Sequence, residues 1–383
     1  LCIIKPHSFF KILPLRLLHI IFCHLSALAR TVKLLLFFIF CAFCNTHAQK
    51  YNFTTYTVAD GLPNNQINDV HQDKYGRLWV ATNNGVCRYD GASFIQFNQD
   101  NPLSNNAVKT IYEDNEGNIW LGTVRKGACM FTGTTTKFFT IQDGLLSDIV
   151  NAITKDKTGH VWIGTAEGLC VFDGKEFSNY TTLTGLSGNY ITSLFTDKAG
   201  DVWIGTLNGV MKYSNKKFYT YTTADGLSGN LVYSITQTKD FKIYISTNSG
   251  FTTFDGNRFY TSANKSALPA EKINAVFEDY KGNRWFATAG GGLAMADEGV
   301  YQVFNQQKGL SSDFVQAITE DREGNLWLGT VNGLCRYSGD RFVTFTPDEI
   351  QSTTKIISAY CDKSNKIWLG TISNGVYYFD GSK

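Results

Sequence analysis

Polar side chains recur at one place in a repeated pattern of this sequence, Leu-x-x-polar-x-apolar, where the chain enters a predicted strand. They are Asn65, Asn106, Asp148, Asn189, Asn230, Glu271 and Asp313, with Thr354 as the nearest equivalent in the last repeat. Amides and carboxylates accept hydrogen bonds, and amides also donate them, so this set could hold a carbohydrate or another polar small molecule. The same residue types commonly bond the backbone of tight turns, and that structural role is the alternative.

Two cations could extend such a site. Arg125 and Lys126 lie in a loop one residue longer than most of its equivalents, and residues 288–292 and 371–375 form the other two long loops. Exceptions to a regular framework are candidate contact points. We expect these cations at the edge of a site for a neutral or weakly anionic oligosaccharide, although adjacent exposed cations also serve solubility alone.

The sequence contains few residues suited to catalysis or to metal binding. Beyond residue 48 the chain has two histidines, His71 and His160, at unrelated repeat positions, which argues against a His-based triad or a His-rich metal site. The recurring acids precede a turn Gly by three residues, or Asn365 in the last repeat, which predicts that they cap hairpin turns. They are Asp73, Asp114, Asp156, Asp197, Asp279, Asp321 and Asp362. We expect no catalytic residue, no metal and no cofactor.

The elements that position these residues follow from an internal repeat of 41 or 42 residues. Its most regular member is an aromatic residue, found at Trp79, Trp120, Trp162, Trp203, Trp285, Trp327 and Trp368, with Tyr244 in the fifth of eight repeats. Each repeat holds four strand-length runs separated by Gly and Asp turn residues, without helical periodicity. This pattern predicts an all-β fold, a β-propeller of four-stranded blades with the aromatic residues packed between blades.

The repeat resembles that of the two-component regulator propeller family. The resemblance rests on the Trp-apolar-Gly-Thr core and on the Asp-Gly-Leu segments at 60–62, 143–145 and 225–227, and it extends from Tyr51 to the end of the chain. It implies a non-enzymatic periplasmic ligand-sensing propeller, the input module of a two-component signalling system, with a downstream histidine kinase or connector domain as partner in a longer parent.

Two other functions stay open beside the sensor. One is a stand-alone secreted propeller that acts as a protein-protein adaptor or cell-surface assembly factor. The other, less favoured because no acid, base and nucleophile converge, is a lyase, since virginiamycin-type lyases are also propellers with Trp-containing repeats.

The ends of the repeat array predict how the ring closes. Residues 53–56 match the fourth strand of other repeats, and the last repeat contains three strands before Lys383. The N-terminal strand could therefore complete the last blade and remove exposed sheet edges. We expect one eight-bladed propeller, with seven blades plus the start of a second propeller as the alternative.

The first 48 residues differ in composition from the rest. An eleven-residue apolar run, residues 34–44, follows Arg30 and Lys33 and precedes small residues up to Ala48, which predicts a secretory signal peptide at 1–48 and a propeller domain at 49–383. We expect Leu1 to Thr31 to be over-translated leader, with an amphipathic membrane-surface helix as the alternative. The location is then periplasmic or secreted, or tethered to the membrane in a longer parent.

The net charge argues against nucleic acid as a partner. The chain has 35 Lys and Arg against 33 Asp and Glu, and the first 48 residues contain five of the cations and no acid. The remainder therefore carries a formal charge of −3, which does not suit a phosphate backbone.

Four of the five cysteines beyond residue 48 occupy one repeat position. Cys87, Cys129, Cys170 and Cys335 stand where other repeats have Met211, Thr252, Ala294 and Tyr377. A position that accepts such different side chains predicts a packing site rather than a disulfide or a metal ligand.

Overall fold

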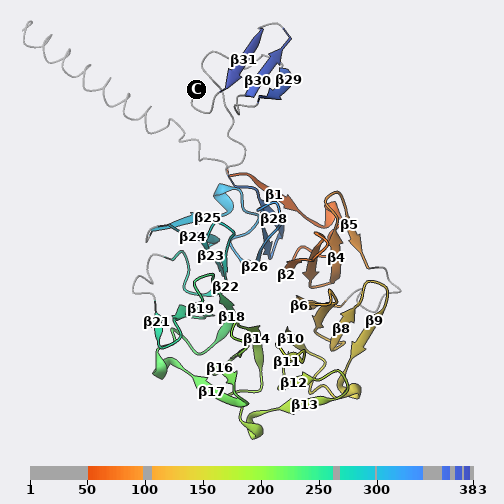
Figure 1. Ribbon diagram of the computed structural model, residues 1–383, viewed down its shortest axis with the longest axis vertical. Coiled ribbons are helices and arrows are strands. Elements are labelled where there is room, and N and C mark those ends of the chain that lie inside the picture. Colours follow the sequence, from red (N-terminus) through yellow and green to blue (C-terminus); the bar gives the residue numbers. More distant parts are fainter. Residues whose placement is uncertain are drawn as a thin grey trace, which may run out of the picture. The chain divides into compact units, whose positions relative to one another are not determined.

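The computed structural model describes residues 51–97, 106–261, 268–297, 300–339, 356–362, 367–372 and 375–379. Within these ranges the chain forms antiparallel strands joined by turns and by short 3-10 turns (Figure 1). Helices are limited there to single 3-10 turns, and no helix of the described part is long and apolar enough to cross a membrane. The predicted all-β fold is confirmed.

Each of the first six repeats forms one four-stranded sheet whose strands pair in chain order. Blade 1 contains β2 (Ile67–Gln72), β3 (Leu78–Thr82), β4 (Gly85–Tyr89) and β5 (Phe94–Gln96). Blade 2 contains β6 (Val108–Glu113), β7 (Ile119–Thr123), β8 (Ala128–Phe131) and β9 (Thr136–Phe139), and blade 3 contains β10 (Val150–Lys155), β11 (Val161–Thr165), β12 (Leu169–Phe172) and β13 (Phe177–Tyr180). Blade 4 contains β14 (Ile191–Thr196), β15 (Val202–Thr206), β16 (Gly209–Ser214) and β17 (Lys217–Tyr221), and blade 5 contains β18 (Val232–Gln237), β19 (Ile243–Thr247), β20 (Gly250–Phe254) and β21 (Phe259–Thr261). Blade 6 contains β22 (Ile273–Glu278), β23 (Arg284–Thr288), β24 (Leu293–Asp297) and β25 (Val300–Phe304). The first strand of each blade lies innermost in the ring (Figure 1).

Blade 7 takes its fourth strand from the start of the propeller. It contains β26 (Val315–Glu320), β27 (Leu326–Thr330) and β28 (Gly333–Tyr337), and β1 (Phe53–Tyr56) pairs with β28, with Phe53 opposite Tyr337. The inner strands β26 and β2 then lie against each other, so the seven blades form a closed ring (Figure 1).

The expected eight-bladed ring is therefore wrong, and the seven blades of the alternative are confirmed, while the start of a second propeller in the eighth repeat stays a prediction. The eighth repeat forms a separate three-stranded sheet of β29 (Ile356–Cys361), β30 (Ile367–Thr371) and β31 (Val376–Phe379), which among the described residues pairs with no other strand. The physical reason is that the seventh and eighth repeats offer the same type of edge to the N-terminal strand. Pairing with β28 also stacks Tyr56 on Trp327 and places Phe53 against Phe304.

The hydrophobic core consists of seven clusters, each shared by two neighbouring blades. Trp79 of blade 1, for example, packs against Ile111 and Leu121 of blade 2, and Trp327 of blade 7 packs against Val70 of blade 1. The prediction that the aromatic residues pack between blades is confirmed. In the eighth sheet the equivalent Trp368 is 40% exposed, whereas the Trp side chains of the ring are buried.

The recurring cysteine position is also a packing site, as predicted. Cys87, Cys129, Cys170 and Cys335 are buried and free, and each belongs to an inter-blade cluster. Burial raises the pKa of the Cys87 thiol to about 12. Burial likewise raises the pKa of Cys129 to about 12 and that of Cys170 to about 11, so these three thiols stay protonated at neutral pH.

Candidate functional site: the mouth of the central channel

The two ends of the ring differ in what lies there. We call the end at which the innermost strands begin the mouth face, and the end that carries the Asp-x-x-Gly turns, such as residues 73–76, the turn face. Five 3-10 turns lie on the mouth face ahead of the inner strands: η1 (Val58–Asp60), η2 (Ile141–Asp143), η3 (Thr182–Thr184), η4 (Thr223–Asp225) and η6 (Gln306–Lys308).

Every inner strand of the ring contains a β-bulge at its second residue. In β2 the pairing with β3 passes from Ile67 directly to Asp69, and the other six inner strands show the same shift. A bulge places two successive side chains on one side of a strand and often re-aims a side chain at a functional site. Asn68 and Asp69 both reach toward blade 2 in this way.

The bulge residues line a cavity of about 530 Å³ at the mouth of the channel. We call them the mouth ring: Asn68, Lys109, Asn151, Thr192, Tyr233, Asn274 and Gln316. Tyr190, Leu207 and Leu231 complete the lining. A deeper cavity of about 280 Å³ is lined by the mouth ring and by the one or two residues that follow each of its members. The combined size and mixed polar and apolar lining are typical of small-ligand sites.

Three asparagines of the mouth ring link neighbouring inner strands. The Nδ2 atom of Asn68 donates to the Val108 carbonyl at 2.7 Å, and Asn151 and Asn274 bond the next blade in the same manner. An inner strand has one edge without a partner strand, so these amides satisfy backbone carbonyls that the channel would otherwise leave to water.

Asp69 carries the one carboxylate among the residues that line the two cavities. Its two oxygens accept from the backbone N–H groups of Val70 and Ile111, each at 2.8 Å. Burial raises the pKa of Asp69 to about 6, in spite of these two hydrogen bonds and the nearby His71, which lower it. The equivalent residues in other blades are Thr110, Ala152, Ser193, Ser234, Ala275 and Ala317.

The polar set predicted from the sequence lies on the mouth face but bonds turns. In five blades its Oδ1 atom accepts, at 2.7 to 2.9 Å, from the backbone N–H at the start of a 3-10 turn. These pairs are Asn65 with Val58, Asp148 with Ile141, Asn189 with Thr182, Asn230 with Thr223, and Asp313 with Gln306. None of the five lines either channel cavity.

For the other members of that set, the structure describes no bond to a 3-10 turn. Asn106 is buried, and Glu271 is exposed. The positions that would donate to them, 99 and 264, lie outside the described residues, as does Thr354.

Arg125 and Lys126 also lie on the mouth face. Their loop joins this face because the N–H of Gly127 donates to the Asp148 carbonyl at 3.0 Å. Both cations are exposed, and neither lines the channel cavities.

The recurring acids have a second partner that sequence reasoning missed. Besides accepting turn N–H groups, Asp197 accepts from the indole Nε1 of Trp203 at 2.9 Å. The other pairs repeat this bond at 2.8 to 3.1 Å: Asp73–Trp79, Asp114–Trp120, Asp156–Trp162, Asp279–Trp285, Asp321–Trp327 and Asp362–Trp368. A signal existed, because repeat five lacks both members and has Thr238 and Tyr244 instead.

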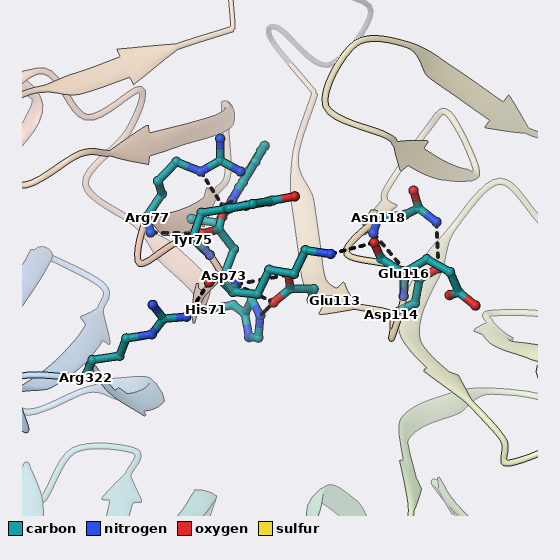
Figure 2. Close-up of polar contacts among 11 residues, drawn as sticks. His71, Asp73, Tyr75, Arg77, Glu113, Asp114, Glu116, Asn118 and Arg322 are labelled. Carbon is teal, nitrogen blue, oxygen red and sulfur yellow. Dashed lines mark hydrogen bonds and ion pairs between the residues drawn. The ribbon is translucent and has the colours of Figure 1, made fainter.

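Polar side chains on the turn face join neighbouring blades. Figure 2 shows His71 and Glu113, from adjacent inner strands, meeting there, with Nε2 and Oε2 3.2 Å apart. Glu113 also accepts from the Lys74 N–H, and the Lys74 ammonium donates to the Glu116 carbonyl. Similar bonds link Lys198 to Gln237, Lys239 to Glu278, Tyr280 to Glu320 and Arg322 to Gln72.

A metal site is not formed by the residues that the structure describes, because no three His, Cys, Asp or Glu side chains gather there in a suitable group. His71 lies on the turn face, and His160 lies in a turn beside Asp156. The mouth cavities therefore present binding groups, among the described side chains, without a nucleophile paired to a histidine base.

Comparison with known sequences identifies the repeat. The model of the two-component regulator propeller family matches five segments, residues 61–84, 102–125, 144–167, 185–208 and 309–332. A 57-residue stretch is 40% identical to histidine kinase P4 of Formosa agariphila, which is 14% of this chain and 4% of the kinase.

Solved structures share the fold. The extracellular domain of a putative hybrid two-component system from B. thetaiotaomicron is 22% identical with a TM-score of 0.67, over 87% of this chain and 48% of that domain. Virginiamycin B lyase from Staphylococcus aureus is 13% identical with a TM-score of 0.59, over 75% of this chain and 98% of the lyase. The chain thus spans about half the length of the extracellular domain and a small part of the kinase.

Proposed function

The repeats of this chain belong to the two-component regulator propeller family, and we propose that the propeller is a non-enzymatic ligand-sensing input module of a two-component signalling system. The observation that carries the proposal is the family match in five of the seven ring repeats, each covering loops that surround the channel mouth. Such a module signals by binding its ligand more tightly in one of two arrangements of an assembly, which requires no chemistry in the propeller.

The ligand that we propose is a glycan fragment in the periplasm or outside the cell. Its site needs hydrogen-bonding groups and a concave surface, both of which the mouth cavity offers. The five turn-bonding residues and Asn106 remain candidate contacts through the side-chain atoms that the turns do not use, and Arg125 and Lys126 remain candidates at the edge. The signalling partner would be a histidine kinase or a connector domain of a longer parent.

A binding role is also supported by the positions of the two histidines. His71 is bonded to Glu113 on the turn face, and His160 lies in a surface turn. Neither lines the mouth cavity, so among the described side chains a ligand there would meet no histidine base. We propose that the chain requires neither metal nor cofactor.

An adaptor function is the second candidate, and exposed apolar residues on the mouth face favour it. Leu183 is 96% exposed, and Ile141 and Val58 are more than half exposed, all in 3-10 turns of this face. Apolar side chains grouped on one face are common in protein-protein contacts.

Deleting the gene in the bacterium that carries it distinguishes the two functions. We expect a sensor mutant to lose the transcriptional response to one glycan class while its surface proteins assemble normally. Unchanged transcription on every glycan, with a defect in surface assembly, would support the adaptor and contradict the sensor.

A further inference from the structure

Blade 4 leaves polar groups of the channel mouth without partners. In blades 1, 3 and 6 an asparagine of the mouth ring bonds the next inner strand, but blade 4 has Thr192 at this position. Thr192 Oγ1 and Ser193 Oγ are both shielded from solvent, and neither makes a hydrogen bond to a described residue. Buried polar groups are nearly always bonded, so two neighbouring exceptions indicate a missing partner.

Apolar side chains border the same sector. Tyr190 and Leu207 of blade 4 are 41% and 45% exposed although both line the mouth cavity, and Leu231 and Tyr233 of blade 5 continue this wall. The Lys272 ammonium lies 4.4 Å from the centroid of the Tyr233 ring, in a cation–π contact. The sector therefore offers an aromatic and aliphatic wall beside unpaired hydroxyl groups.

We infer that the sector of blades 4 and 5 binds one terminal sugar ring of a neutral oligosaccharide, which enters the mouth end-on. This inference rests on the proposed sensor function and assigns its site. A pyranose has a C–H face that suits the Tyr190 and Leu207 wall and an edge of hydroxyls that donate and accept, as Thr192 and Ser193 require.

The charges of the cavity favour a neutral ligand over an anionic one. Among the described side chains, Lys109 lines both cavities and Asp69 lines the deeper one, so the combined lining carries one charge of each sign. An anionic sugar ring would meet the Asp69 carboxylate deeper in the channel, where burial weakens screening by water. The carboxylate oxygens can instead accept further hydroxyl donors.

Calorimetric titration of the purified chain against neutral arabino-, xylo-, galacto- and manno-oligosaccharides, with sulfated and uronate-bearing oligosaccharides beside them, tests the inference. We expect a neutral member to bind, and Tyr190→Ala and Thr192→Val each to weaken binding by at least about tenfold. Phe314→Ala, the equivalent of Tyr190 on blade 7 outside the cavity, is the matched control and should bind as the wild type does.

Thr192→Val also separates a binding role from a structural one. Because the hydroxyl has no described partner, its removal should leave the melting temperature of the free protein unchanged or raise it. A variant that melts lower and keeps its affinity would overturn the inference.

Hydrogen exchange with the same saccharide locates the ligand directly. We expect protection of amides in β14 and β18 and none on the turn face. Protection elsewhere, with an intact transcriptional response in the host, would refute this site and keep the sensor. Binding in this sector without any transcriptional response would refute the sensor and keep the site. If only extended peptides bind, the ligand class is wrong.

Discussion

The same seven inner strands end in two different ways. On the turn face the side chain of the last residue in an inner strand commonly accepts a hydrogen bond from the preceding blade. Glu113 accepts from the Lys74 N–H, and Gln72 accepts from the Arg322 N–H across the closure of the ring. On the mouth face the side chains of Thr192 and Ser193 have no described partner. Side chains of the turn face thus bond neighbouring blades, whereas the mouth face of blade 4 leaves two hydroxyls unbonded, and we propose that these serve ligand recognition.

Removal of the closing strand should have the largest effect. Deleting residues 51–57 leaves blade 7 with three strands and an exposed β28 edge, which is an aggregation hazard. We expect the shortened chain to aggregate or to lose cooperative unfolding, measured by light scattering and thermal melts. A soluble monomer with an unchanged melting curve would contradict the closure described here.

Loss of a tryptophan at a blade interface should rank second. Trp203→Ala empties a buried site between blades 4 and 5 and leaves Asp197 without its indole donor. We expect the free energy of unfolding in urea to fall by about 3 to 5 kcal/mol. Tyr219→Ala, at an exposed position of the same blade, is the control, and a similar loss in both variants would contradict the assignment.

The pH dependence of the free energy of unfolding should reveal the raised pKa of the Asp69 carboxyl. Its pKa is raised to about 6 in the folded chain, so the folded state binds this proton more tightly than the unfolded state does. The resulting stability is present below about pH 4 and is lost as the pH rises through 6. Relative to the wild type, Asp69→Ser, which copies Ser193 and Ser234 of blades 4 and 5, should gain at most about 3 kcal/mol between pH 4 and pH 7.

Urea unfolding of both proteins at the two pH values measures this gain. If the free energies of unfolding of the two proteins change equally between pH 4 and pH 7, the pKa of Asp69 is not raised by burial. Asp60→Ser changes an exposed carboxylate that caps η1, and it controls for the loss of an acid outside the channel.

Loss of two turn-bonding amides should have the smallest effect. Asn189→Ala combined with Asn230→Ala removes the acceptors for the Thr182 and Thr223 N–H groups, both on exposed turns. We expect the double variant to unfold about 1 to 2 kcal/mol more easily. Its affinity for the saccharide should fall less than that of Thr192→Val, and a larger fall would move the site from the channel to the loops.

Periodicity sufficed to predict the blades but not their closure. A repeat of four strand-length runs specifies a blade, and the recurring Trp specifies what lies between blades. The partner of residues 53–56 could not be read from sequence, because the edges of β28 and β31 present the same residue pattern.

The channel site escaped sequence reasoning for a different reason. The mouth ring contains Asn in three blades and Lys, Thr, Tyr or Gln in the other four, so no single residue type marks the position in every repeat. The bulges that bring the ring together are backbone features. The polar residues that do recur lie three positions before the mouth-ring residues. They recur because Asn and Asp side chains bond the backbone of the neighbouring 3-10 turn.

One pair of variants tests the division between the two faces most directly. Thr192→Val changes the mouth face, and Glu113→Ala changes the turn face, where it removes the acceptor for the Lys74 N–H and the partner of His71. Each variant should be titrated with the saccharide that the wild type binds and unfolded in urea. We expect Thr192→Val to lose affinity at unchanged stability, and Glu113→Ala to lose about 1 to 3 kcal/mol of stability at unchanged affinity. The reverse pattern, with the turn-face variant losing affinity and the mouth variant losing stability, would contradict the account.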